Sequence, residues 1–179
     1  MKAQWNMNKI LRHVRHDMLN DIQLLKGYMS LNQMDKVQGL IDKIIIEART
    51  EGRLFNLRLE NFAEMLVTYN WETHPIVVEY EVLEEPQDMS IYDNVITDWT
   101  TSFLAMLETN IDPMYEHNMT VSIELDGEDA CFFFDFRGKL LEKETVEKWL
   151  HDNRNVNNLF VETIHVDQEE VCTKLTTRK

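Results

Sequence analysis

An uninterrupted helical pattern near the start of the chain constrains the fold more than any other feature. Between about Asn6 and Leu31 there is no proline, and apolar residues recur at steps of four and three: Met7, Leu11, Val14, Met18, Ile22, Leu25 and Met29. This spacing places them on one face of a helix. After a short turn at 31–34, a second stripe comprises Val37, Ile41, Ile44, Ala48 and Phe55. The pattern predicts an αα-hairpin over residues 1–59.

Both stripes are wider than a pair of helices can bury. The first is widened by Ile10, Leu19, Leu24 and Tyr28, and the second by Leu40, Ile45 and Ile46. Two packed helices hide only one face each, so the remaining apolar surface needs another cover. A second copy of the chain would supply it by closing a dimeric four-helix bundle. The alternative cover is the C-terminal part of the chain, folded back on the hairpin.

Beyond residue 59 the pattern changes to mixed helices and strands. Helices are expected at about 61–69, from an N-cap at Ser90 to a stop at Asp112-Pro113, and at 143–152. Strands are expected at 74–84, 119–125, 130–136, 158–166 and 170–176, with Asp126-Gly127 as a hairpin turn. The fold class is therefore α+β, with the hairpin followed by a domain over residues 60–179 that contains a mostly antiparallel sheet.

Composition excludes several classes of function. The net charge of −14 argues against binding to nucleic acid. Two cysteines form neither a disulfide framework nor a metal quartet. No signal peptide and no apolar run of roughly 20 residues is found, so we expect a cytoplasmic protein without a membrane partner. Residues 1–30 nevertheless carry five basic and two acidic side chains. This bias suits an acidic partner, although a segment this short can acquire it by chance.

His16 is the residue that most clearly suggests chemistry. It lies two positions from both Val14 and Met18, about 200° around the helix from the apolar stripe, and is expected to face water. One nitrogen of a neutral imidazole can attack while the other keeps its proton, and a carboxylate can fix that tautomer. Asp17 is adjacent, but neighbouring residues diverge by about 100° on a helix. Asp17 could therefore contact His16, a neighbouring helix or a partner.

Other polar residues share the exposed ridge of His16. Arg12, His13 and Asn20 lie at i−4, i−3 and i+4, and Arg15 flanks them. Either arginine could pair with phosphoryl oxygens or with acids around a donor site. The alternative for all of these residues is a solvated helix face without a task, and a lone surface histidine would usually be assigned the same way.

A family resemblance favours the chemical interpretation. The pattern H-D-x-x-N-x-I/L-Q-x-I/L-x-G-x-x-x-L is filled by His16, Asp17, Asn20, Ile22, Gln23, Leu25, Gly27 and Leu31. It resembles the phospho-acceptor helix of the sporulation initiation phosphotransferase B family and of citrate- and dicarboxylate-type sensor histidine kinases. Two further segments resemble the start of that family's C-terminal domain: Asn70-Trp71-Glu72-Thr73-His74 and Glu79-Tyr80-Glu81-Val82-Leu83.

The resemblance implies a homodimer with a four-helix bundle and a C-terminal domain shaped like a degenerate kinase ATPase domain. It also implies that His16 accepts phosphate, with Asp17 and Asn20 as supporting residues. Contacts to a partner are expected from four further residues of the same helix: Arg12, His13, Arg15 and Gln23.

The glycine content distinguishes a kinase from a carrier. Kinases of that fold need an asparagine-bearing helix for Mg²⁺ and glycine-rich loops that approach the phosphates. The chain has five glycines, and none follows Gly138. Residues 104–110, ending at Asn110, resemble a degenerate form of the asparagine-bearing helix. Asp135-Phe136-Arg137-Gly138 resembles a degenerate form of the first glycine-rich segment. We expect no bound cofactor and no ATP, with structural roles for Asn110 and Asp135.

The donor implied by the resemblance is an aspartyl phosphate on a response regulator, which would hold the Mg²⁺. His16 would then pass the phosphoryl group to an aspartate of a second regulator, in the control of sporulation initiation. Two alternatives remain open: a degenerate sensor kinase that still uses ATP, and a scaffold that docks a regulator without chemistry.

Overall fold

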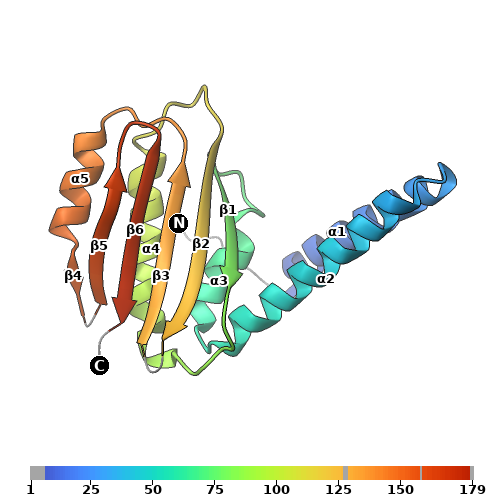
Figure 1. The fold of residues 1–179 in the computed structure, drawn as a ribbon, viewed down its shortest axis with the longest axis horizontal. Coiled ribbons are helices and arrows are strands. Elements are labelled where there is room, and N and C mark those ends of the chain that lie inside the picture. Colours follow the sequence, from blue (N-terminus) through green and yellow to red (C-terminus); the bar gives the residue numbers. More distant parts are fainter. Residues whose placement is uncertain (1–6, 127–128, 158, 178–179) are drawn as a thin grey trace. The chain divides into compact units, whose positions relative to one another are not determined.

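The computed structural model describes residues 7–126, 129–157 and 159–177. Two compact units make up the chain, residues 1–49 and 50–179, and the division falls within helix α2 (Met34–Asn56). The predicted boundary lay at 59/60. The α+β fold class is confirmed, since helices come first and a six-stranded sheet follows (Figure 1).

The predicted αα-hairpin is present in the first unit. Helix α1 (Met7–Ser30) is joined to α2 by a tight turn in which Asn32 has φ 54°. Asparagine tolerates this left-handed conformation better than most residues. The backbone N–H of Gln33 donates to the Tyr28 carbonyl at 2.9 Å, and the Lys36 ammonium lies 5.5 Å from the Tyr28 ring centroid. These contacts hold the two helices together at the turn.

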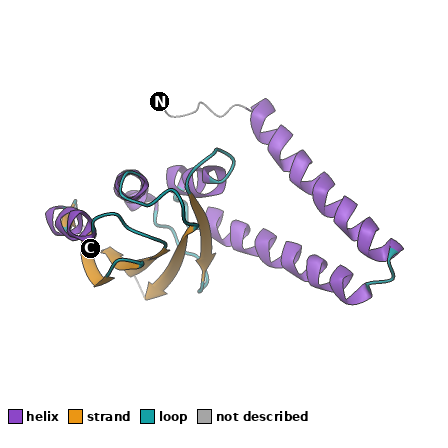
Figure 2. Cartoon of the chain, turned by 90° about the horizontal axis from the view of Figure 1, so that it is seen from above, coloured by secondary structure: helices purple, strands orange, loops and turns teal. Residues whose placement is uncertain are grey.

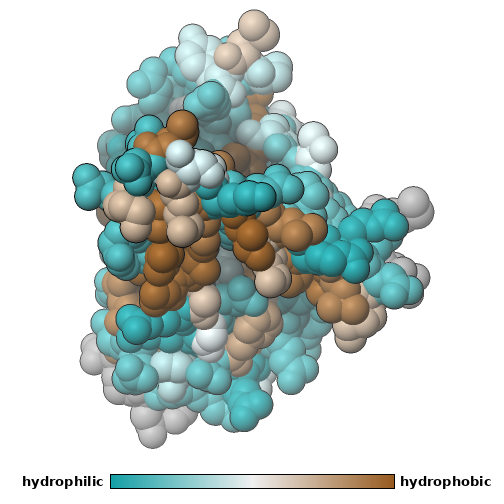
Figure 3. Space-filling view, turned by 90° about the vertical axis from the view of Figure 1, so that its right-hand side faces the viewer, coloured by the Kyte–Doolittle hydropathy of each residue, from teal (hydrophilic) through white to brown (hydrophobic). Residues whose placement is uncertain are grey.

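The apolar stripe predicted on α1 is largely uncovered in a single chain. Its members Met7, Leu11, Val14, Met18, Ile22 and Met29 are between 46% and 68% exposed. No residue of α1 is fully buried. The side chains that are partly buried are Ile10, His13, Asp21, Leu25 and Tyr28. Hydrophobic side chains accordingly reach the surface in the space-filling view (Figure 3).

The last turn of α2 belongs to the core of the second unit. Leu54, Leu57 and Leu59 are completely buried there. The Arg53 guanidinium donates to the Val82 carbonyl at 3.1 Å, and Arg58 turns the chain with φ 59°. Burial of these leucines ends α2 and starts α3 (Glu60–Tyr69) at a defined place.

The second unit is built on one sheet in the order β1-β2-β3-β6-β5-β4. Among the described strands, β1 and β2 form the one parallel pair, which confirms the mostly antiparallel prediction. The strands are β1 (Ile76–Val82), β2 (His117–Asp126), β3 (Asp129–Arg137), β4 (Asn155–Val156), β5 (Leu159–Val166) and β6 (Glu170–Thr177). The two-residue β4 was not predicted because it is too short to show an alternating pattern.

Helices cover one face of this sheet. They are α3, α4 (Asp93–Glu108) and α5 (Lys143–Asp152), and they lie on the same side of the strands (Figures 1 and 2). Phe132, Phe134 and Phe136 of β3 are completely buried, as their alternation predicted. Phe132 contacts Phe62 of α3, and Phe134 lies 5.3 Å from Trp99 of α4 between ring centroids. The opposite face of β3 stays partly exposed.

Two predicted helix limits were wrong. Ser90 does not cap a long helix but opens a single 3-10 turn (Ser90–Tyr92), where its N–H donates to the Asp88 carboxylate at 3.0 Å. Helix α4 ends at Glu108, three residues before Ile111, which instead forms a β-bridge with Leu140. The first difference arises from the nearby Asp88 side chain, and the second from a distant backbone partner that local helical spacing cannot reveal. The predicted turn Asp126-Gly127 lies partly outside the described residues.

The first residue of α4 caps α3. The buried Asp93 carboxylate accepts hydrogen bonds from the backbone N–H groups of Asn61 and Phe62, both at 3.0 Å, and from the Asn61 amide at 2.8 Å. The unpaired donors at the start of a helix are thus satisfied by a distant side chain.

We expect Asp93→Ala to lower the free energy of unfolding by about 2 kcal/mol, because it leaves buried N–H groups without an acceptor. Urea unfolding monitored by circular dichroism would measure the change. Asp93→Asn retains one acceptor oxygen and should lose less. A loss of under about 0.5 kcal/mol for Asp93→Ala would contradict the capping role.

The hydroxyl of Tyr69 introduces a dependence of stability on pH. It donates to Glu108 Oε1 at 2.5 Å, and burial, followed by the bond to Glu108 and its charge, raises the pKa of Tyr69 above its ordinary value of 10.0. Folding raises the pKa of this tyrosine, so its contribution to stability is fully present at pH values below its pKa in the unfolded chain. The contribution is lost progressively as the pH rises above that pKa. Wild type should therefore lose stability steeply above pH 10, and Tyr69→Phe less steeply. Urea midpoints on either side of pH 10 test this, and equal slopes would contradict it.

Candidate functional site

His16 lies in the middle of α1 with 70% of its side chain exposed. Its Nδ1 atom is 3.1 Å from Asp17 Oδ1 and 3.2 Å from Asn20 Nδ2. Within the described part of the chain, the other ring nitrogen, Nε2, makes no hydrogen bond or ion pair. The site is thus a single imidazole held at one nitrogen and open to water at the other.

Helical geometry brings these three side chains together. Asn20 is one turn beyond His16, so both lie on the same ridge. Asp17 could have faced a neighbouring helix or a partner, but its carboxylate reaches the imidazole of the preceding residue. The arrangement therefore needs only α1, and no other element contributes a hydrogen bond to His16 among the described residues.

The two partners of Nδ1 require opposite protonation states. A carboxylate only accepts, so Asp17 needs a proton on Nδ1; the Asn20 amide nitrogen only donates, so it needs a lone pair there. A neutral imidazole carries one proton, so it satisfies one partner at a time. When the proton sits on Nδ1, the lone pair of Nε2 faces water and is available as a nucleophile.

The remaining residues predicted for partner contacts also lie on α1. Arg12, Arg15 and Gln23 are exposed, and their side chains make no hydrogen bond or ion pair with any residue that the structure describes. His13 is partly buried. The two arginines therefore present cationic groups to solvent near His16 along the helix.

Asn110 and Asp135 are occupied by contacts of their own. The buried Asn110 amide donates to the Glu142 carbonyl at 2.7 Å, and its oxygen accepts from the Glu142 N–H at 3.2 Å. Asp135 pairs with Arg137 at 3.0 Å. These contacts support the expectation that both residues serve the structure.

Gly138 supports a close approach between chain segments rather than an open loop. A Cβ atom at this position would lie 2.1 Å from Nδ1 of His117, which is buried. The His117 ring is fixed in turn, because Nε2 donates to the Asp112 carbonyl at 2.9 Å and Nδ1 accepts from the Lys139 N–H at 3.3 Å. Glycine is needed here to admit the imidazole.

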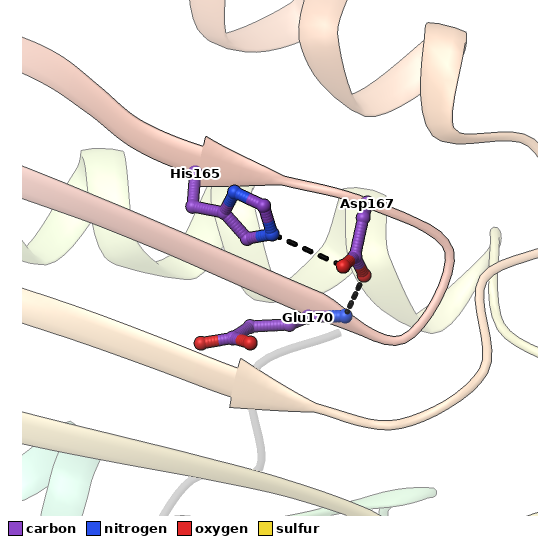
Figure 4. A group of neighbouring side chains, drawn as sticks. All are labelled: His165, Asp167 and Glu170. Atoms are coloured by element: carbon purple, nitrogen blue, oxygen red, sulfur yellow. Dashed lines mark hydrogen bonds and ion pairs between the residues drawn. The ribbon is translucent and has the colours of Figure 1, made fainter.

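A second cluster of titratable side chains lies at the β5–β6 hairpin (Figure 4), and sequence analysis did not single it out. His165 Nε2 is 3.0 Å from Asp167 Oδ2, and Asp167 Oδ1 accepts from the N–H groups of Glu169 and Glu170. The bond from the Glu169 N–H, followed by His165, lowers the pKa of Asp167 to about 2. Arg137 neutralises Glu170 at 2.8 Å. These interactions stabilise the β5–β6 hairpin. The spacing His-x-Asp at the end of a strand is the sequence signal that would have indicated this cluster.

None of the helices in the described part of the chain combines the length and the apolar character needed to cross a bilayer.

Two family models together match almost the whole chain. Residues 1–57 match the model described as Sensor kinase SpoOB-type, alpha-helical domain. Residues 58–178 match the model described as Sporulation initiation phospho-transferase B, C-terminal. The resemblance stated from the His16 pattern is thereby confirmed.

Among individual proteins, the chain is similar to sporulation initiation phosphotransferase B of Bacillus subtilis (strain 168), with 35% identity over 131 residues, covering 72% of this chain and 68% of the relative. Solved structures that match include the histidine kinase AdeS of Acinetobacter baumannii, at 10% identity and a TM-score of 0.40, covering 90% of this chain and 96% of the kinase chain. The catalytic domain of histidine kinase ThkA matches at 11% identity and a TM-score of 0.41, covering 71% and 92%. From the two family models and the 35% identical relative, the chain belongs to the sporulation initiation phosphotransferase B family.

Proposed function

We propose that this protein is a cytoplasmic phosphotransferase in the phosphorelay that controls sporulation initiation. His16 accepts a phosphoryl group from the aspartyl phosphate of one response regulator and passes it to an aspartate of a second. The observation that carries the proposal is the exposed His16 ring, engaged at Nδ1 and open at Nε2, on the helix that matches the family's helical model.

The transfer begins with the Nδ1–H tautomer of His16, which Asp17 favours by accepting that proton. The Nε2 lone pair attacks phosphorus in line, and the phosphorus–oxygen bond to the donor aspartate breaks. Such a transfer depends mainly on positioning and charge neutralisation. The regulator's acidic pocket would hold the Mg²⁺, and this chain would need no cofactor of its own.

The cationic side chains of α1 suit this docking. Arg12 and Arg15 are exposed without an internal partner in the described chain, so they can pair with acids around the donor aspartate or with phosphoryl oxygens. His13 lies between the two arginines and Gln23 lies farther along the same helix, and both would complete the contact. The C-terminal unit is acidic, so it would contribute contact surface to the regulator rather than electrostatic attraction.

Contacts in the C-terminal unit support a donor other than ATP. Both polar atoms of the Asn110 side chain are bound by the backbone of Glu142, so its oxygen, the atom that would ligate Mg²⁺, already accepts a hydrogen bond. The space beside Gly138 is filled by His117. A phosphate cradle of backbone N–H groups would require a different conformation of both segments.

We also propose that the chain works as a homodimer. A stripe of apolar side chains between 46% and 68% exposed runs along α1, and monomeric soluble proteins seldom leave so much contiguous apolar surface uncovered. A second hairpin with the same stripe is self-complementary and closes a four-helix bundle. His16 points away from that stripe, so it would stay accessible in the dimer.

We expect His16→Gln to abolish phosphoryl acceptance, because glutamine is of similar size but has no nucleophilic ring nitrogen. Purified protein would be mixed with ³²P-labelled phospho-regulator, and separately with labelled ATP. Label should reach wild type from the regulator and should be absent from His16→Gln.

His13→Gln is the matched control, since it changes a histidine of the same helix that contacts the regulator without accepting phosphate, and it should still be labelled, more slowly than wild type. Label from ATP would instead support a degenerate kinase. No label from either donor, with regulator binding intact in His16→Gln, would support a scaffold without chemistry.

The dimer makes a separate prediction. Ile22→Glu places a charge in the proposed apolar interface and should convert a species of twice 21.3 kDa into one of 21.3 kDa in sedimentation equilibrium. Gln38→Glu, on an exposed polar position of α2, is the control and should stay dimeric. A wild type that sediments as a monomer would favour the C-terminal unit as the cover of the stripe.

A further inference from the structure

We propose that Asn20 is a positioning residue that sets how long His16 keeps its phosphoryl group. Asn20 stabilises the phosphorylated ring without a proton on Nδ1, which keeps the group bound. Asp17 acts in the opposite direction, because it stabilises the ring with a proton on Nδ1. The inference deepens the proposed function and rests on it, since it concerns the phosphorylated state of the same histidine.

The geometry behind this inference is the sharing of one nitrogen by two partners. Asp17 Oδ1 and Asn20 Nδ2 lie 3.1 and 3.2 Å from the same Nδ1 atom, and their demands exclude each other. Neither side chain makes another hydrogen bond or ion pair within the described residues, so each is free to follow the protonation state of His16.

Phosphorylation makes this competition consequential. When the Nε2 lone pair forms the nitrogen–phosphorus bond, the phosphorus–oxygen bond of the donor breaks and its electrons return to the donor's carboxylate. The ring still carries the Nδ1 proton and is now an imidazolium. Loss of that proton to water gives a neutral phospho-imidazole whose Nδ1 lone pair can accept the Asn20 N–H.

Release of the phosphoryl group from His16 requires that Nδ1 be protonated again. Cleavage of the nitrogen–phosphorus bond sends its electrons to Nε2; from the imidazolium this releases a neutral imidazole, whereas from the unprotonated ring it would release an imidazolide anion, a far poorer leaving group. The Nδ1 proton therefore controls release. Asp17 promotes it, while Asn20 opposes it.

Other charged groups on this helix are the same in the Asn20 and Asp17 variants as in wild type, so their effect on the ring cancels when the variants are compared. Arg12 and Arg15 bring positive charge and disfavour the imidazolium, and His13 lies one turn before His16. With the ring 70% exposed, one hydrogen bond gained or lost at Nδ1 should change the lifetime by about two- to tenfold.

The experiment labels the protein with phosphoramidate, a small phosphoryl donor, and follows the decay of phospho-His16 at constant pH. Asn20→Ala should shorten the lifetime two- to tenfold. Asn20→Asp, which can only accept, should shorten it further, and Asp17→Asn should lengthen it. Asn8→Ala removes an exposed asparagine from the same helix and should leave the lifetime unchanged.

A second readout needs no phosphorylation. Nitrogen-15 NMR of the neutral His16 ring should show that Asn20→Ala shifts the tautomers toward Nδ1–H and that Asp17→Ala shifts them toward Nε2–H. Alanine favours helix, so both variants should stay folded. Unchanged tautomers and lifetimes in Asn20→Ala, or a longer lifetime, would overturn the inference.

These measurements use no response regulator, so they separate this inference from the proposed function. Failure of labelling from a phospho-regulator would refute the relay role, while opposite effects of the Asn20 and Asp17 variants would still establish the control of the Nδ1 proton.

Discussion

Burial of three phenylalanines along β3 is the interaction on which the C-terminal unit depends. Phe132, Phe134 and Phe136 sit at the centre of the sheet, completely buried, and the helices that cover the sheet pack against them. Each buried aromatic side chain contributes on the order of 2 kcal/mol or more from the removal of apolar surface from water. The position of α3 and α4 follows from this packing.

The ends of the covering elements are held by side chains that imitate backbone. Asp93 binds the N–H groups at the start of α3, and the Asn110 amide binds both backbone groups of Glu142. Asn70 does the same at the outer edge of β1, where its amide pairs with the N–H and the carbonyl of Val78. These three side chains commit their polar atoms to their own unit, which in the proposed function serves as a supporting part rather than a nucleotide site.

The helical unit has the opposite character. Among the described residues, the hydrogen bonds of His16 are with Asp17 and Asn20 of the same helix, and the apolar stripe of α1 remains open. In the proposed function, the apolar face pairs with a second copy of the chain, whereas the ridge presents a nucleophile and cations to an acidic response regulator. In this proposal, two faces of one helix serve two different associations. The protonation of a single nitrogen, Nδ1 of His16, influences both the phosphoryl transfer and the lifetime of phospho-His16.

Local patterns determined much of this protein. The hairpin, the strands around Phe132–Phe136, helix α5 and the exposed position of His16 follow from periodicity, because hydrophobic spacing and the helical turn act over a few residues. Helical spacing also placed Asn20 beside His16, for the same reason, and it left open whether Asp17 contacts His16 or another partner.

Tertiary structure alone decided where α4 ends, that Ile111 pairs with Leu140, and that Asp93 and Asn110 serve distant backbone groups. It also decided that Gly138 stands against His117. These partners are separated by 20 residues or more along the chain, so their hydrogen bonds and close approaches depend on packing of the whole unit, and no local spacing encodes them.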